Sequence, residues 1–293
     1  SMISLVGLDG LRPTLQLIKF THNIAIANKE SLICGWNLIK KNLLYYKTNF
    51  IPVDSEHFSI FSLLKNYNKN LIDKIFITAS GGPFLNYSKS DLLKVNLNEA
   101  LNHPNWKMGK KITIDSSTMM NKVFEVIEAK NIFAVSYDQI QILTHPSSYV
   151  HAIVKFNNGI TKILLHDTDM KIPIHNSIYK DNFKKIDSKP LNLDILNNLK
   201  FKKIDIKKFP VVKLIQFLPK KNSLYETALI SINDYLVSKY LEKKITYTKL
   251  VKLINFHANH KNFTKYRKSN AKNVDTIYKI RDYVNLKLEA LGI

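Results

Sequence analysis

The chain has 293 residues, of which 45% are hydrophobic and 23% charged. This composition excludes a disordered tail protein, and the length predicts two or three domains. No apolar run reaches the roughly 18 residues of a membrane-spanning helix, and the first residues lack the basic and apolar regions of a secretory signal. The single cysteine, Cys34, excludes an internal disulfide and a cysteine-rich zinc site, so we expect a reducing, cytoplasmic compartment.

The charge balance is strongly basic, with 44 Lys and Arg against 23 Asp and Glu and a net charge of +21. Such a chain raises the alternative of an RNA- or membrane-binding protein. Only Arg12, Arg267 and Arg281 are arginines, although arginine makes the bidentate base contacts that nucleic-acid readers favour. We interpret the excess lysine as compositional bias and expect neither a nucleic-acid nor a membrane partner, with the basic binding protein as the alternative.

Short apolar runs bounded by glycine or polar residues predict β-strands in the first part of the chain. We expect these strands at residues 2–7, 24–27, 50–53 and 74–79. Leucines and isoleucines at helical spacing around Pro13 predict a helix between the first two strands. Polar residues follow two of the strands, at 54–57 and 80–83. Because ligands of α/β sheets bind outside the carboxyl ends of strands, both segments are candidate site residues.

Helical and extended patterns alternate along the rest of the chain. Helices are expected at 88–102, 119–129, 223–242, 246–255 and 273–290, and strands at 111–115, 139–145, 149–156 and 160–166. The polar stretch 180–208 is typical of a linker, and residues 103–109 break the periodicity. These elements predict an α/β unit, an α+β domain with a mixed sheet, and a C-terminal helical domain.

The first candidate site is Asp54-Ser55-Glu56, directly after a predicted strand. In an extended chain, positions i and i+2 point the same way, so the two carboxylates would lie together at the strand end. Paired carboxylates repel each other unless they hold a cation or share a proton, and oxygen ligands suit Mg²⁺ or Mn²⁺. The alternative is a solvated loop with two surface acids.

A second candidate site surrounds the start of the helix predicted at 119–129. Four polar residues at 115–118 precede this helix, and the free amides of a helix start attract phosphate. Asn121 and Glu125 are four residues apart and share one face, with Lys122 beside Glu125. The alternative is an ordinary capped helix with a salt bridge.

The segment Ser80-Gly81-Gly82-Pro83 is a weaker candidate for phosphate binding. Paired glycines allow close backbone approach, and the Ser80 hydroxyl can donate to a phosphate oxygen. The same residues are also typical of a plain turn.

Six strings occur in an order that is specific to one enzyme family. They are ANKESL at 27–32, PVDSEH at 52–57, SGGPF at 80–84, HPNWKMG at 103–109, DSSTMMNK at 115–122 and DMKIPI at 169–174. Together they closely resemble the 1-deoxy-D-xylulose 5-phosphate reductoisomerase family over residues 1 to about 175, whereas the C-terminal part matches only loosely.

The resemblance implies roles for the matching residues. The metal ligands would be Asp54, Glu56 and Glu125. The substrate would be bound by Ser55, Glu56, Ser80, His103, Trp106, Ser116, Asn121, Lys122 and Glu125. Of these, its phosphate would be held by Ser80, Ser116, Asn121 and Lys122. The catalytic residues would be Lys29, Glu56, His103, Glu125 and His145. The cofactor would be bound by Lys29, Glu30, Gly109 and Met170, with Met170 beside the nicotinamide ring. Residues 103–109 would form a lid.

The implied activity is isomerisation of 1-deoxy-D-xylulose 5-phosphate and its NADPH-dependent reduction to 2-C-methyl-D-erythritol 4-phosphate, in the non-mevalonate isoprenoid pathway. Mg²⁺ or Mn²⁺ would polarise the substrate ketone and a neighbouring hydroxyl. The resemblance further implies a homodimer, in the cytoplasm or, in a eukaryote, in the stroma of a plastid-type organelle. One rival is a related metal-dependent sugar-phosphate enzyme with an altered reaction.

The sequence departs from the family at the nucleotide-binding domain. The chain has eight glycines, and none of them forms a phosphate loop of the Gly-x-Thr-Gly-Ser type. We expect residues 1–54 to be a remnant, the tail of that NADPH-binding α/β domain, followed by a catalytic domain at 55–179, a linker at 180–208 and a helical domain at 209–293. We therefore expect weak NADPH binding by this chain alone, and an inactive truncated form is a second rival.

Overall fold

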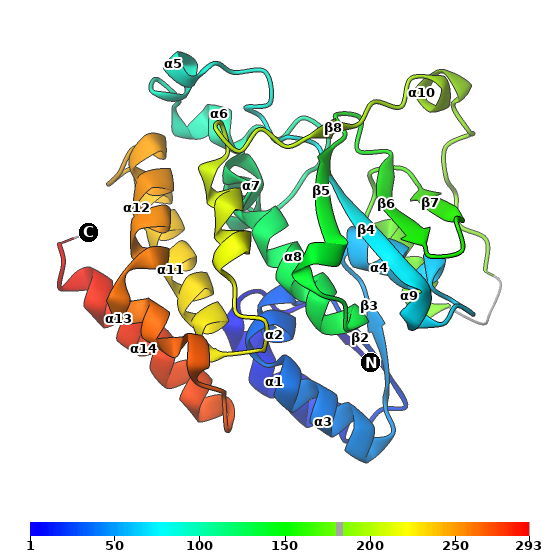
Figure 1. Ribbon diagram of the computed structural model, residues 1–293, viewed down its shortest axis with the longest axis horizontal. Helices are drawn as coiled ribbons and strands as arrows, with labels where there is room; N and C mark the ends of the chain where they lie inside the picture. The colour runs from blue at the N-terminus through cyan, green and yellow to red at the C-terminus, as the bar shows by residue number, and fades with distance from the viewer. Residues whose placement is uncertain (180–183, 293) are drawn as a thin grey trace.

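The computed structural model describes residues 1–179 and 184–292, and its first fifty residues form a small parallel sheet with helices (Figure 1). The strands pair in the order β1 (Met2–Ile3), β2 (Asn23–Ile26) and β3 (Asn49–Pro52). The helices are η1 (Leu8–Gly10), α1 (Leu11–Ile18), α2 (Lys29–Cys34) and α3 (Trp36–Tyr46). The strands predicted at 24–27 and 50–53 and the helix around Pro13 are confirmed. The run at 2–7 forms only a two-residue strand.

A five-stranded mixed sheet lies in the middle of the chain, in the order β7-β6-β4-β5-β8. Its strands are β4 (Ile72–Ala79), β5 (Ile140–Thr144), β6 (Val150–Phe156), β7 (Thr161–Leu165) and β8 (Lys202–Lys203). Short 3₁₀ helices precede β4 and β5: η2 (Lys69–Leu71) and η3 (Tyr137–Gln139). β4 and β5 are parallel, and the other neighbours are antiparallel, which confirms the predicted mixed sheet. Gly159 has a φ of 86° in the turn between β6 and β7.

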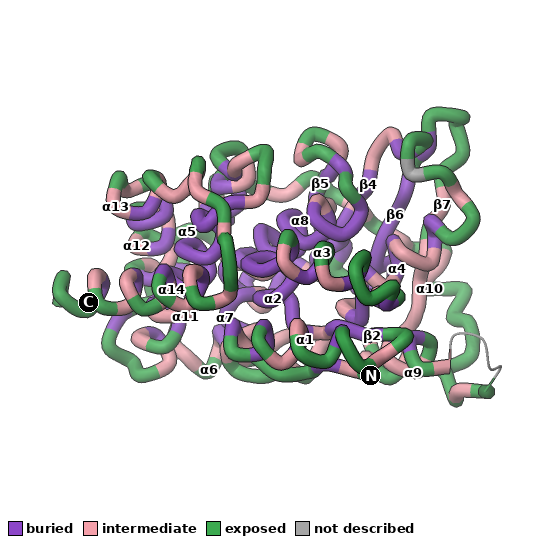
Figure 2. The backbone as a smooth tube through the Cα atoms, turned by 90° about the horizontal axis from the view of Figure 1, so that it is seen from below, coloured by how far each residue is buried: buried purple, intermediate pink, exposed green. Residues whose placement is uncertain are grey.

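Helix α8 (Met120–Phe133) lies between the sheet and the C-terminal helices (Figure 1). All of its residues are buried except Asn121 and Lys130, which are half-buried, and Figure 2 shows buried backbone concentrated around it. A helix that is buried around most of its circumference is stable only inside a core. Two further helices complete this region: α4 (Ser55–Leu63), which packs against β6 and β7, and α9 (Lys171–Ile178), which packs against α4.

The segment 111–115 was expected to be a strand, and this prediction is wrong because the segment lies in helix α7 (Lys110–Thr118). The β-branched residues Ile112 and Ile114 favour a strand by local preference. The helix instead places Lys111 Nζ 3.0 Å from Asp115 Oδ2, four residues along, and buries Ile114 in the core. Tertiary contacts therefore override the local preference here.

The single helix expected at 88–102 is two short helices, α5 (Lys89–Leu92) and α6 (Leu97–Leu101). Each begins with a capping box, formed by Ser88 and Asp91 in α5 and by Asn96 and Glu99 in α6. A capping box satisfies the first free amides of a helix, so the second box starts a new helix within the stretch.

The expected linker 180–208 contains regular structure, so that prediction is wrong for its second half. Residues 180–183 lie outside the described residues. The rest includes α10 (Leu193–Asn197) and the edge strand β8, in which Lys202 is paired with Thr144 of β5. The polar composition favoured a linker, but the backbone amides and carbonyls of an edge strand need no apolar side chains to pair with a neighbouring strand.

The C-terminal region is helical, as predicted. Its elements are η4 (Pro210–Phe217), α11 (Leu224–Leu241), α12 (Tyr247–Asn259), α13 (Lys261–Thr264), η5 (Lys265–Lys268) and α14 (Val274–Glu289). Helix α11 packs against α2 and α7 as well as α12 and α14, so one hydrophobic core runs from the N-terminal sheet to the last helix. None of the helices in the described part of the chain combines the length and apolar character needed to cross a membrane.

Candidate active site

A cavity of about 200 Å³ lies where β4 ends, between the starts of α4 and α8, the end of α7 and the segment 103–109. Twelve of the residues assigned to the site from the sequence line it: Lys29, Asp54, Ser55, Glu56, Ser80, His103, Trp106, Ser116, Asn121, Lys122, Glu125 and Met170. Of the remaining predicted residues, Glu30 and Gly109 line a neighbouring cavity and His145 lines neither. Residues from six separate stretches of sequence therefore meet at one place.

Asp54 and Glu56 lie at the start of helix α4 and not on an extended strand. Asp54 is the N-cap, and its carboxylate accepts a hydrogen bond from the Glu56 amide at 3.3 Å. The i, i+2 argument for their proximity is therefore wrong, although the two carboxylates do meet. Their side chains are only 12% and 15% exposed, which also excludes the alternative of a solvated loop.

The polar residues 115–118 precede α8 as expected, but they end helix α7. The Thr118 hydroxyl accepts a hydrogen bond from the Met120 amide at the start of α8, at 3.3 Å. Met119, with a φ of 69°, joins the two helices and redirects the chain. Gly82, also at positive φ, approaches this junction so closely that a Cβ would lie 3.1 Å from the carbonyl oxygen of Ser116. The loop after β4 thereby brings Ser80 to the same cavity as Ser116.

Three carboxylates in the cavity form a set that can hold a metal ion. Oxygen atoms of Asp54, Glu56 and Glu125 lie within 4.8 Å of one another. Three carboxylate oxygens suit a hard divalent cation such as Mg²⁺ or Mn²⁺. Asn121, one turn before Glu125 on α8, donates from its amide to Glu125 Oε1, as the shared helix face predicts.

Two buried lysines balance the charge of these carboxylates. Lys29 Nζ lies 3.0 Å from Asp54 Oδ2 and 3.6 Å from Glu125 Oε1. Lys122 Nζ lies 2.6 Å from Glu56 Oε1 and 2.5 Å from Glu125 Oε2. The salt bridge between Lys122 and Glu125, which was the alternative to a phosphate site, thus exists. It lies inside the cavity, where Lys122 bridges two of the three carboxylates.

Burial and neighbouring charges shift the pKa values of this group. Burial, reinforced by the Glu56 carboxylate, raises the pKa of Glu125 to about 7. Burial alone would lower the pKa of Lys122 and of Lys29, but the carboxylates beside them raise both well above the ordinary lysine value. Lys29 and His57 hold the pKa of Asp54 well below its usual range, against the effect of burial.

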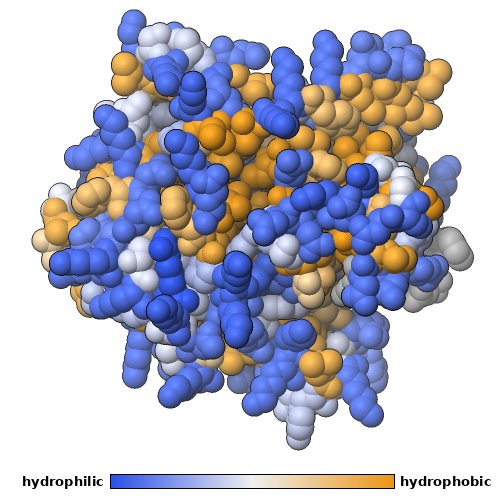
Figure 3. All heavy atoms as spheres, in the orientation of Figure 1, coloured by the Kyte–Doolittle hydropathy of each residue, from blue (hydrophilic) through white to orange (hydrophobic). Residues whose placement is uncertain are grey.

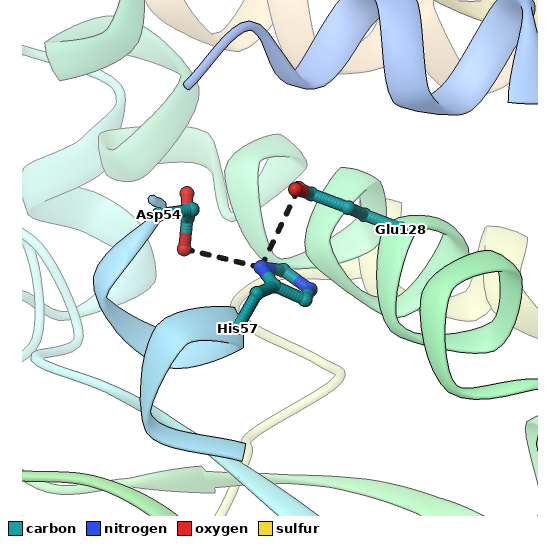
Figure 4. Close-up of side chains that lie close together, drawn as sticks. All are labelled: Asp54, His57 and Glu128. Atoms are coloured by element: carbon teal, nitrogen blue, oxygen red, sulfur yellow. Dashed lines mark hydrogen bonds and ion pairs between the residues drawn. The ribbon is translucent and has the colours of Figure 1, made fainter. Parts of the chain in front are cut away.

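His57 and Glu128, which the sequence analysis did not single out, lie beside Asp54 (Figure 4). His57 Nδ1 is 3.2 Å from Asp54 Oδ1 and 3.5 Å from Glu128 Oε2. Burial alone would lower the pKa of His57, but Glu128 and Asp54 raise it to about 9. The available signal was spacing, because His57 follows Asp54 by three residues and Glu128 follows Glu125 by three, one helical turn each.

The cavity is also lined by neutral donors and a neutral histidine. His103 Nδ1 accepts from the amides of Asn105 at 3.2 Å and Trp106 at 3.0 Å. Nε2 therefore carries the proton of the neutral ring and donates to Ser80 Oγ at 3.2 Å. Burial, with a smaller effect of Lys122, lowers the pKa of His103 to about 4.

His151 also lines the cavity, although the sequence analysis gave it no role. Its ring stacks on His166 with a centroid distance of 3.7 Å, and its Nε2 donates to the His166 carbonyl oxygen at 3.1 Å. Burial, followed by His166, lowers the pKa of His151 to about 3. Its position six residues after His145 offered no recognised motif.

A second cavity of about 350 Å³ adjoins the first and shares Lys29 and Asn121 with it. Glu30 and Gly109, assigned to cofactor binding from the sequence, line it together with Lys110 and Lys111. The pocket therefore combines apolar walls with lysines, a pattern that suits a ligand with phosphate groups. Gly109 leaves open space there, since a Cβ would meet no atom within 4 Å.

His145 lies outside both cavities among the described residues. Its Nδ1 donates to the Lys200 carbonyl oxygen at 2.9 Å, and its Nε2 accepts from the Val150 amide at 3.1 Å. The ring also stacks on Phe201. This fully buried histidine thus fastens the start of β6 to the segment before β8, which gives it a structural place in the described part of the chain.

The chain matches three sequence families that describe one enzyme. Residues 1–35 match 1-deoxy-D-xylulose 5-phosphate reductoisomerase, residues 50–133 match the C-terminal domain of that enzyme, and residues 165–285 match a family described as DXP reductoisomerase C-terminal domain.

Curated relatives carry the same description. The 1-deoxy-D-xylulose 5-phosphate reductoisomerase of Pelagibacter ubique is 55% identical over 293 residues, which are 100% of this chain and 76% of the relative. That of Wolbachia pipientis wMel is 41% identical over 260 residues, covering 87% of this chain and 66% of the relative.

Solved structures share the fold. A DOX-P reductoisomerase in complex with NADPH, fosmidomycin and magnesium superposes with a TM-score of 0.89 at 32% identity, over 99% of this chain and 74% of the other. The enzyme from Zymomonas mobilis in complex with NADPH has a TM-score of 0.86 at 29% identity, over 99% and 74%.

Proposed function

The chain belongs to the 1-deoxy-D-xylulose 5-phosphate reductoisomerase family, and we propose that it isomerises this sugar phosphate and reduces it with NADPH to 2-C-methyl-D-erythritol 4-phosphate. The reaction belongs to the non-mevalonate isoprenoid pathway. One observation carries the proposal: oxygen atoms of Asp54, Glu56 and Glu125 converge within 4.8 Å in a cavity that Ser80 and Ser116 also line.

The three carboxylates fit Mg²⁺ or Mn²⁺ by the chemistry of their oxygen donors. A divalent ion held there polarises the substrate ketone and a neighbouring hydroxyl. Asn121 fixes the Glu125 carboxylate by its hydrogen bond, and the Asp54 carboxylate is fixed by the amide of Glu56. The role of this chain is thus to hold the ligands in one orientation before the substrate arrives.

We assign the phosphate of the substrate to Ser80, Ser116, Asn121 and Lys122. Hydroxyls, an amide and an ammonium group can all donate to phosphate oxygens, and all four residues line the cavity. The neutral His103 ring keeps the Ser80 hydroxyl in place from the side of the lid. Binding energy from the phosphate, which does not react, orients the end of the substrate that does.

Residues 103–109 are proposed to close over the substrate as a lid. His103, Trp106 and Met108 from this segment line the cavity, and Asn105 attaches it to the Pro146 carbonyl oxygen at 2.7 Å. Closure would exclude water from the reacting carbons. Ser55 and Lys29 lie on the opposite wall and are proposed to contact the carbon backbone of the substrate.

We propose that NADPH binds across the neighbouring cavity, where it supplies the hydride. Lys29, Glu30 and Gly109 line that cavity, and Met170 lines the first one, next to the expected nicotinamide position. The parallel sheet of residues 1–54 supports our interpretation of this stretch as part of an NADPH-binding α/β domain. Residues 55–179 and 209–293 would then be the catalytic and helical domains.

A homodimer is proposed on the sheet edge next to β8. Leu191, Leu193 and Ile206 are 61%, 64% and 43% exposed in the segment around this edge strand. Figure 3 shows apolar side chains near α10 at the upper right, in addition to a broader apolar area across the middle of the same face. An edge strand with apolar side chains beside it is suited to pairing with a second copy. The cytoplasmic location stays an expectation.

Product analysis tests the proposed reaction. The full chain is incubated with 1-deoxy-D-xylulose 5-phosphate, NADPH and Mn²⁺, and products are identified by mass spectrometry while NADPH oxidation is followed optically. Formation of 2-C-methyl-D-erythritol 4-phosphate with matching NADPH loss supports the proposal. A different product identifies the related enzyme with an altered reaction, and no turnover with intact Mn²⁺ binding identifies the inactive form.

A further inference from the structure

A buried histidine contacts two of the three residues proposed as metal ligands. His57 lies on α4, one turn after Asp54, and is fully buried. Figure 4 shows its ring between Asp54 and Glu128, with Glu128 projecting from α8. His57 lines neither of the two cavities described above, so it is not placed to touch a substrate bound there.

The partners of the two ring nitrogens define what His57 can do. Nε2 lies 2.9 Å from the backbone carbonyl oxygen of Glu125, which can only accept, so Nε2 carries a proton. Nδ1 lies 3.2 Å from Asp54 Oδ1 and donates to it. One rigid ring therefore ties the Asp54 carboxylate on α4 to the backbone of Glu125 on α8.

The Glu128 carboxylate is buried beside His57, with Lys29 as a further positive charge that acts on it. Its Oε2 atom is buried without a hydrogen-bond partner among the described residues, yet it lies 3.5 Å from His57 Nδ1. A buried carboxylate is costly unless a charge nearby compensates it. A ring that carries protons on both nitrogens supplies such a charge. Because Glu128 lies close to the same ring nitrogen as Asp54, the positive charge of the ring is divided between the two carboxylates.

We propose that His57, held by Glu128, is a positioning residue that fixes the Asp54 carboxylate for a divalent metal ion. The inference rests on the proposed function, since it needs the metal centre of Asp54, Glu56 and Glu125. Outer hydrogen-bond partners of metal ligands restrict the orientation of the ligand, and their loss typically weakens metal binding about 10- to 100-fold.

Two substitutions separate the hydrogen bonds of the ring. In His57→Asn, the side-chain amide can occupy the place of Nδ1 and still donate to Asp54. In His57→Gln, the longer side chain can replace Nε2 and donate to the Glu125 carbonyl, but the donor to Asp54 is lost. We expect His57→Gln to weaken Mn²⁺ binding about 10- to 100-fold and His57→Asn to weaken it at least threefold less.

Mn²⁺ titration of the intact chain, followed by electron paramagnetic resonance, measures these affinities and the symmetry of the bound ion. The metal-free unfolding temperature of each variant is measured in parallel, with His257→Gln as a control because His257 is buried in α12 away from the site. Equal losses in both His57 variants, or losses that follow the unfolding temperature, overturn the proposal. A changed Mn²⁺ spectrum in His57→Gln at unchanged folding supports it.

Glu128→Gln tests the second half of the proposal, because it removes the charge and keeps the shape. We expect a two- to tenfold weaker Mn²⁺ affinity, and an unchanged affinity overturns the role of Glu128. Asp54, His57 and Glu128 could also hold a cation of their own, and two Mn²⁺ ions per chain would overturn the positioning role in favour of that site. If the unsubstituted chain binds no Mn²⁺, the proposed metal centre itself fails.

Discussion

Two groups of lysines and carboxylates in this protein are built alike but differ in burial and in whether their carboxylates converge. In the cavity, Lys122 bridges Glu56 and Glu125 at 2.6 and 2.5 Å. Between α2, α7 and α11, Lys111 Nζ lies 3.0 Å from Glu30, 3.0 Å from Asp115 and 2.9 Å from Asp234. Each lysine is held by carboxylates from separate segments of the chain.

The carboxylates of the two groups are arranged differently around their lysines. Those in the cavity converge with Asp54 into a set that can hold a metal ion, whereas the carboxylates around Lys111 form no such set in the part of the chain that the structure describes. The Lys111 group instead joins three helices that are distant in sequence. A group of charged side chains therefore indicates a metal site only where several ligand atoms converge. Glu30, which is proposed to bind the cofactor, also forms a structural ion pair with Lys111.

Glu56→Gln is the change that should affect the cavity group most. The substitution removes the negative charge of one proposed metal ligand, so we expect no measurable turnover. We also expect Mn²⁺ affinity to fall by more than the roughly 100-fold that is typical when a hydrogen-bond partner of a metal ligand is lost. Calorimetric titration with Mn²⁺ measures it, with the unfolding temperature as control. An unchanged Mn²⁺ affinity in the folded variant would remove Glu56 from the ligand set.

Lys111→Met should affect folding and leave the metal centre unchanged. The substitution leaves Glu30, Asp115 and Asp234 without their shared cation. Because Lys111 and Asp234 are 26% and 35% exposed, we expect a loss of about 1–3 kcal/mol of unfolding free energy, less than breaking a fully buried ion pair costs. Urea unfolding measures this loss, and Lys110→Met, at an exposed neighbour on the same helix, is the matched control. If Lys111→Met instead lost much of its Mn²⁺ affinity at normal stability, the Lys111 group would contribute to metal binding and not only to folding.

Lys122→Ala should weaken binding of a phosphonate analogue of the substrate by roughly 1.5–3 kcal/mol, the value of a hydrogen bond to a charged group. Calorimetry in the presence of Mn²⁺ measures the affinity, and Lys130→Ala, on the same helix α8 but outside the cavity, is the control. Should a non-phosphorylated analogue bind the unsubstituted chain equally well, the phosphate would not be recognised at Lys122.

The smallest expected effect concerns a buried histidine of the cavity wall. Burial lowers the pKa of His151 to about 3, so between pH 6.5 and 3 the unfolded chain takes up a proton that the folded chain does not. Stability contributed by the neutral ring is therefore present above about pH 6.5 and is lost as the pH falls. His151→Gln, which keeps a donor near the His166 carbonyl, should show a flatter decline of unfolding free energy from pH 7 to 4. An unchanged slope would contradict the shifted pKa.

The local sequence pattern was sufficient to predict those helices and strands whose hydrophobic periodicity is regular. The strands β4 to β7 and the helices α8, α11, α12 and α14 follow from hydrophobic periodicity and turn residues. The site residues could be named because six strings of this sequence match one family. That match places Asp54, Glu56 and Glu125 together without any knowledge of their backbone conformation.

The sequence thus determined the order of the elements, the family and most of the residues that line the cavity. Only the tertiary structure decided that residues 111–115 are helical, because Lys111 reaches Glu30, 81 residues earlier, and Asp234 on α11. It also decided that Asp54 caps a helix and that His57 lies between Asp54 and Glu128. Periodicity reports on backbone repeats within a segment, whereas these arrangements depend on partners from distant segments, whose positions no local pattern contains.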